Sequence, residues 1–107
     1  MRAALLLSAL LSATSALAQT TTALPETSVS EHMAVSTNDG RVIIEVLKVQ
    51  QNTVSLSIIL DAKEPLAFLD QHPGDKITLN AEEDTYDVDI RATRGLSVTL
   101  AVSRHPR

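Results

Sequence analysis

The chain contains no cysteine and no tryptophan, and Phe68 and Tyr86 are its only phenylalanine and tyrosine. The absence of cysteine excludes disulfide bonds, a thiol nucleophile and a lipid anchor on a cysteine. The scarcity of aromatic rings excludes an extensive stacking platform for nucleic-acid bases and an interface built on aromatic anchors. A folded core must therefore be built from valine, isoleucine and leucine.

Residues 1–18 have the pattern of a cleavable secretory signal peptide. Arg2 supplies a positive start, residues 3–11 are almost wholly apolar, and Ala16 and Ala18 place small residues before a cleavage site. The apolar run is too short for a membrane span, which needs about 20 residues. The sequence predicts cleavage after Ala18 and a periplasmic or secreted protein without a membrane anchor.

The charge balance of the predicted mature protein is acidic. The whole chain has 9 basic and 13 acidic residues, a net charge of −4, and removal of Arg2 with the signal makes it −5. A negative domain disfavours binding to nucleic acid and to anionic membrane surfaces, so neither is an expected partner. The 89 residues after the signal leave room for one domain.

The mature chain divides into a polar leader and a region of alternating residues. Residues 19–27 lack apolar periodicity and are predicted to form a flexible leader, followed by a single β domain over 28–107. In that domain apolar and polar residues alternate with the period of a strand. The predicted strands cover residues 28–36, 41–49, 54–60, 76–79, 86–91 and 96–103.

The stretch between residues 61 and 75 is the least regular. Around residues 65–69 the pattern fits either a short helical turn or an edge strand. The connections between predicted strands are too short for parallel crossovers. The expected fold is therefore all-β, a small antiparallel sandwich or partly open barrel of six to seven short strands, and the pattern does not separate the two.

No catalytic motif is present. The chain has neither a G-x-S-x-G elbow nor an S-x-x-K pair, and His32, His72 and His105 lack the spacing of zinc ligands. We therefore predict a protein that is not an enzyme and needs no cofactor. A catalytic alternative would require a concave site that gathers His72 with Asp70 or Asp75.

An acidic cluster is the sharpest local feature. It puts five carboxylates within eight residues: Glu82, Glu83, Asp84, Asp87 and Asp89. Calcium takes six to eight oxygen ligands, so this cluster is the candidate metal site. The ordinary interpretation is a solvated, salt-bridged face, because no calcium-loop motif accompanies the carboxylates.

Basic residues follow the acidic cluster, and no acid occurs from residue 91 onward. Two interpretations stay open: the charges pair across the sheet, or they steer an oppositely charged protein partner. The candidate binding residues are Asp87, Asp89, Arg91, Arg94 and Arg104.

These features favour a noncatalytic protein-binding module, of the assembly or inhibitor kind, that acts on another exported protein. It would use its charged surfaces or the unpaired backbone groups at its sheet edges. The alternative function is binding of calcium or another small ligand by the carboxylates of residues 82–89. The separation of acidic from basic segments also permits self-association.

Overall fold

The computed structural model describes residues 20–107, so the predicted signal peptide over residues 1–18 lies outside the described residues. Within residues 20–107 there is no helix long and apolar enough to cross a membrane. The regular elements are eight strands: β1 (Thr21–Ser30), β2 (Ala34–Ser36), β3 (Val42–Val49), β4 (Val54–Leu60), β5 (Leu66–Gln71), β6 (Lys76–Asn80), β7 (Asp84–Arg94) and β8 (Ser97–Pro106).

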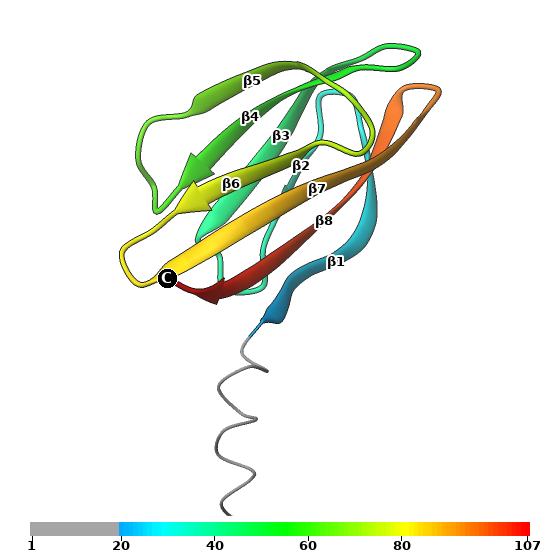
Figure 1. Cartoon of the computed structure of the whole chain (residues 1–107). Helices are drawn as coiled ribbons and strands as arrows, with labels where there is room; N and C mark the ends of the chain where they lie inside the picture. The colour runs from blue at the N-terminus through cyan, green and yellow to red at the C-terminus, as the bar shows by residue number, and fades with distance from the viewer. Residues whose placement is uncertain (1–19) are drawn as a thin grey trace, which may run out of the picture.

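The strands form two antiparallel sheets of four that face each other (Figure 1). One sheet has the order β1-β8-β7-β6 and the other β2-β3-β4-β5. The second sheet is a simple meander, and the chain changes sheets only between β1 and β2 and between β5 and β6. The all-β antiparallel prediction is confirmed and the arrangement is sandwich-like, although the expected six to seven strands are too few.

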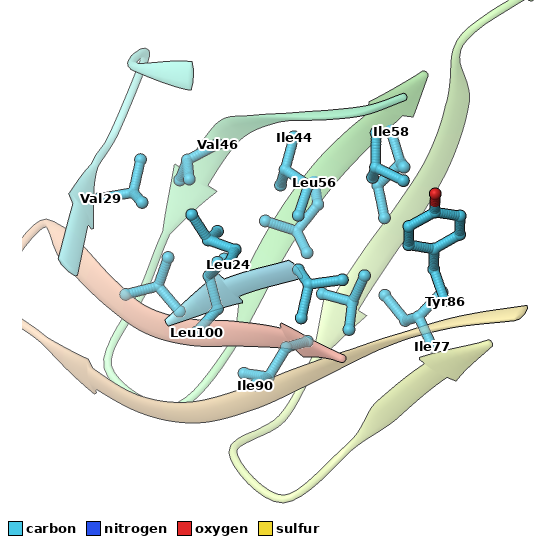
Figure 2. Packing of buried hydrophobic residues seen from close by; sticks show 14 of the residues in the cluster. Leu24, Val29, Ile44, Val46, Leu56, Ile58, Ile77, Tyr86, Ile90 and Leu100 are labelled. Carbon is cyan, nitrogen blue, oxygen red and sulfur yellow. The ribbon is translucent and has the colours of Figure 1, made fainter. Parts of the chain in front are cut away.

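One hydrophobic core fills the space between the sheets. In β7 the side chains of Tyr86, Val88 and Ile90 point inward and are buried, while Asp87 and Asp89 between them point outward. Figure 2 shows Tyr86 and Ile90 of this set in the core that also contains Ile44, Leu56 and Ile58 of the facing sheet. Each fully buried aliphatic side chain contributes about 1.5–3 kcal/mol, so this packing supports a fold without disulfides.

The prediction of a flexible leader over residues 19–27 is wrong for residues 21–27, which lie in β1, and β1 pairs with β8. Ala23 and Leu24 are buried in the core. The β1–β8 ladder has two register shifts, and Pro25 lies within the second, between Leu24 and Thr27. Such irregularities break the alternation of apolar and polar residues from which a strand is predicted.

The single strand expected over residues 28–36 is two strands. The chain turns at residues 31–33, where His32 has a φ of 70°, and β2 then joins the other sheet. The irregular stretch around residues 65–69 resolves as an edge strand, β5, rather than a helical turn.

Candidate functional site

One end of the sandwich carries a polar cluster that we call the Asp39 network: Thr37, Asp39, Arg41, Tyr86 and Arg104. Asp39 lies in the turn between β2 and β3, and its Oδ2 accepts hydrogen bonds from the Tyr86 hydroxyl at 2.5 Å and from Arg104 Nη1 at 3.0 Å. Its Oδ1 accepts from Thr37 Oγ1 at 2.7 Å and from the backbone N of Arg41 at 3.1 Å. One carboxylate thereby links a turn of one sheet to two strands of the other.

Arg41 makes a second link between the sheets. Its Nε and Nη2 donate to the two oxygens of Asp61 at 2.7 and 3.0 Å, a bidentate geometry that is among the strongest a carboxylate makes. Its Nη1 donates to Asp84 of β7 at 3.3 Å, and its guanidinium carbon lies 5.8 Å from the centre of the Tyr86 ring. The ring adds a cation–π attraction to these ion pairs.

The hydrogen bonds to Asp39 hold it in the ionised form. Burial by itself would raise the pKa of Asp39, but bonds from Tyr86, Thr37, the backbone of Arg41 and Arg104 outweigh it and place the pKa well below its usual range. A carboxylate of this kind does not exchange protons near neutral pH, so it is unsuited to general acid–base catalysis.

Tyr86 is shifted in the direction that keeps it neutral. Burial raises the pKa of the Tyr86 hydroxyl, and its hydrogen bond to the negative Asp39 raises it further. The pKa of Asp61 is lowered, chiefly by the hydrogen bonds from Arg41. The Asp39 network is therefore a set of fixed charges that fastens the two sheets together.

The predicted metal ligands do not converge. Asp84 points inward to Arg41, whereas Asp87 and Asp89 point to the outer face of the sheet, and Glu82 and Glu83 are exposed in the turn between β6 and β7. Among residues 20–107, no group of three or more histidine, aspartate or glutamate side chains is arranged to hold a metal ion.

Asp87 accepts hydrogen bonds from neighbouring strands on both sides. Thr78 Oγ1 of β6 donates to Asp87 Oδ1 at 2.8 Å, and His105 Nε2 of β8 lies 3.0 Å from Oδ2. Burial would raise the pKa of Asp87, but the bonds to Thr78 and His105 lower it below its ordinary value. Asp87 thus contacts His105 of the neighbouring strand, whereas the ion pair of Asp89 is with Arg91 of its own strand.

The candidate binding residues also separate into different places. Asp89 and Arg91, 3.9 Å apart, help to line a shallow depression of about 340 Å³ beside β1, together with Glu26. Arg94 is exposed at the end of β7, and Arg104 turns inward to Asp39. The proposed charged surface is therefore not a single patch.

The histidine that a catalytic alternative would need lies in an open turn. His72 Nδ1 is 3.8 Å from Asp75 Oδ2, and both side chains are about half exposed. Neither residue lines the depression beside β1 or the cavity described below.

The four edge strands differ in how well they are protected against pairing with another chain. Proteins protect such edges by short length, proline, lysine or register shifts. β1 contains Pro25 and two register shifts, β2 has three residues, and β6 has five residues and begins at Lys76. β5 has an uncharged apolar stretch from Leu66 to Leu69, and its own register shift, between Phe68 and Gln71, overlaps the end of that stretch.

Apolar side chains are also incompletely covered at the β5 edge. Leu66 and Leu69 are 52% and 61% exposed, and the inward-facing Phe68 and the neighbouring Leu60 are only partly buried against the core. A cavity of about 640 Å³, which is more open to solvent than the depression beside β1, lies here between the two sheets. It is lined by Leu60, Lys63, Glu64, Leu66 and Asn80.

Comparison with known proteins gives no matching family model, no similar curated protein and no similar solved structure. A function for this chain must therefore be inferred from the geometry of its own surface.

The run Leu-Ala-Phe-Leu between Pro65 and Asp70 was the one signal in the sequence that could have identified the β5 edge.

Proposed function

We propose that this chain is a noncatalytic, exported protein-binding module that takes up an extended segment of another protein along the edge of β5. The observation that carries the proposal is the difference among the four edges, of which β5 presents an uncharged apolar stretch without proline or lysine. A segment added there would pair with free backbone groups and cover Leu66 and Leu69.

The calcium alternative has no specific observation in its favour. Asp84 already accepts from Arg41, and Asp87 already contacts Thr78 and His105 on the opposite face of the sheet. A calcium ion would have to displace these partners and gather carboxylates that point in different directions.

Affinity capture with matched lysine variants tests the proposal. Ala67 of β5 and Ala34 of β2 are both exposed, on edge strands at opposite sides of the same sheet. We expect Ala67→Lys to reduce recovery of a specific partner from a periplasmic or secreted fraction by at least about tenfold, because lysine on an edge opposes strand addition. Ala34→Lys should leave recovery unchanged.

Circular dichroism and thermal melting of both variants would establish that each keeps the fold. Recovery that is unaffected by Ala67→Lys, or that falls equally with Ala34→Lys, would show that β5 is not the binding edge.

A further inference from the structure

The two faces of β5 constrain what an added strand can present. Leu66 and Phe68 pair with the buried Ile58 and Leu56 of β4 and face inward, whereas Ala67 is opposite Ser57 and faces outward. Side chains alternate in the same way on every strand of a sheet. Residues of an added segment that lie beside Leu66 and Phe68 would therefore point toward the opening between the sheets.

The cavity lies in the path of those inward side chains. Leu66 begins β5 and Asn80 ends β6, and both line it, together with Leu60. Leu60 and Phe68 also pack against the hydrophobic core, so an apolar side chain placed here would extend that core. The volume of about 640 Å³ is more than one aliphatic side chain fills, and it lies within the range of about 300–1,000 Å³ typical of ligand sites.

Charge selects against an ionised segment. Residues 65–69 carry no charge, and Lys63 and Glu64 at the cavity carry opposite signs, so the site offers no net attraction to either sign. An ionised side chain brought here would be attracted by one of these two residues and repelled by the other, and it would lose part of its hydration. The groove therefore favours an uncharged occupant.

We infer that the occupant is an uncharged, extended peptide segment in which every second residue is apolar, and that one of its apolar side chains enters the cavity beside Leu66. This inference rests on the proposed function, because it specifies the chemistry of the segment that β5 binds. The cavity would then select the side chain of the added strand, whereas backbone pairing alone would accept strands of many sequences.

Single-cysteine trapping tests the inference directly, because the natural chain has no cysteine. Leu66→Cys and Ala67→Cys each place one thiol on β5, on the inward and the outward face. The probes are two blocked seven-residue peptides of alternating valine and threonine, with cysteine in place of a central valine or of a central threonine. The peptide cysteine is activated as a mixed disulfide with thionitrobenzoate, so that the protein thiolate attacks the peptide sulfur and thionitrobenzoate leaves. Side chains directly opposite on paired strands are close enough for disulfide exchange.

We expect Leu66→Cys to react at least about fivefold faster with the valine-site probe than with the threonine-site probe, and Ala67→Cys to show the reverse preference. Ala34→Cys on β2 is the control and should show no preference. Equal rates with both probes at both β5 positions would overturn the inference.

A second variant separates the inference from the proposed function. Leu66→Asn keeps the β5 backbone edge but removes the apolar wall of the cavity, and it changes a side chain that is already half exposed. Direct titration should show at least about fivefold weaker binding of the alternating peptide, with no change in thermal stability. If Ala67→Lys abolishes partner capture but Leu66→Asn binds the peptide normally, the proposed function stands and the pocket is wrong.

Sedimentation analysis decides whether a second copy is the occupant. The inference expects a monomer at the concentrations used for trapping. A dimer that is lost in Ala67→Lys would mean that β5 pairs with itself and would overturn the inference.

Discussion

At the scale of single residues, Tyr86 connects the hydrophobic core with the charged end of the sandwich. Its ring is fully buried and its hydroxyl donates to Asp39 at 2.5 Å, and both features raise its pKa. Because the pKa of Tyr86 is higher in the folded state, its contribution to stability is fully present below the unfolded pKa of about 10. That contribution is lost as the pH rises from there through the folded pKa.

We predict that Tyr86 ionises in the native protein only above about pH 10, the value for an unperturbed tyrosine. The measurement is a titration by phenolate absorbance, which reports this one group because Tyr86 is the only tyrosine. The urea-unfolded chain gives the reference midpoint. In Asp39→Asn the midpoint should fall toward that reference without reaching it, because burial still acts. Identical native and unfolded midpoints would contradict the prediction.

At the scale of elements, the connection from β4 to β5 contains a strained turn. Asp61 and Ala62 have φ values of 54° and 59°, and the N of Lys63 donates to the carbonyl of Leu60 at 3.1 Å, as in a type I′ turn. Aspartate tolerates this conformation, but alanine does not favour it. The turn places Asp61 against Arg41 and leads directly to the cavity at β5.

Ala62→Gly should therefore stabilise the fold by up to about 1 kcal/mol, because the left-handed conformation costs alanine about 1–2 kcal/mol and the extra freedom of glycine costs about 0.5–1 kcal/mol in return. Urea unfolding followed by circular dichroism measures the change. Ala34→Gly, in a strand, should destabilise the protein. A lower stability for Ala62→Gly would show that the turn is not strained by its alanine.

Regular strands could be predicted from the sequence because their burial follows the alternation of their residues. Val54, Leu56 and Ile58 of β4 are all buried, as the pattern predicts. Leu96 has the same parity as the buried residues of β8 but is exposed, because it lies in the hairpin turn after Gly95 and the strand begins at Ser97. Alternation identifies faces within a strand but not the residue at which the strand starts.

The Asp39 network could not be predicted, because its members come together only when the sheets pack. Asp39 and Tyr86 are 47 residues apart, and Asp39 and Arg104 are 65 apart. The sequence identified Arg104 as a candidate binding residue in a basic segment, but not as a partner of Asp39. Likewise, alternation indicates that some strand must form an edge, but it does not show which of the four edges is the least protected.

At the scale of the whole molecule, three carboxylates make the fold sensitive to acid. The pKa values of Asp39, Asp61 and Asp87 are all lowered in the folded state. Each therefore stabilises the fold above its unfolded pKa of about 3.9, and that contribution is lost as the pH falls from there through the folded value. Two of them hold the end of the sandwich at which the cavity opens.

We predict that the free energy of unfolding decreases steadily as the pH is lowered from about 5 to about 2, with net proton uptake on unfolding. Urea titrations at a series of pH values measure this slope. Asp39→Asn should be less stable than the natural chain at neutral pH, because Arg104 and Tyr86 lose their charged partner, but its stability should fall less steeply over the acidic range. Equal slopes for the two proteins would mean that Asp39 is not held ionised by its hydrogen bonds, and the polar link between the sheets would then have to depend on the pair of Arg41 with Asp84.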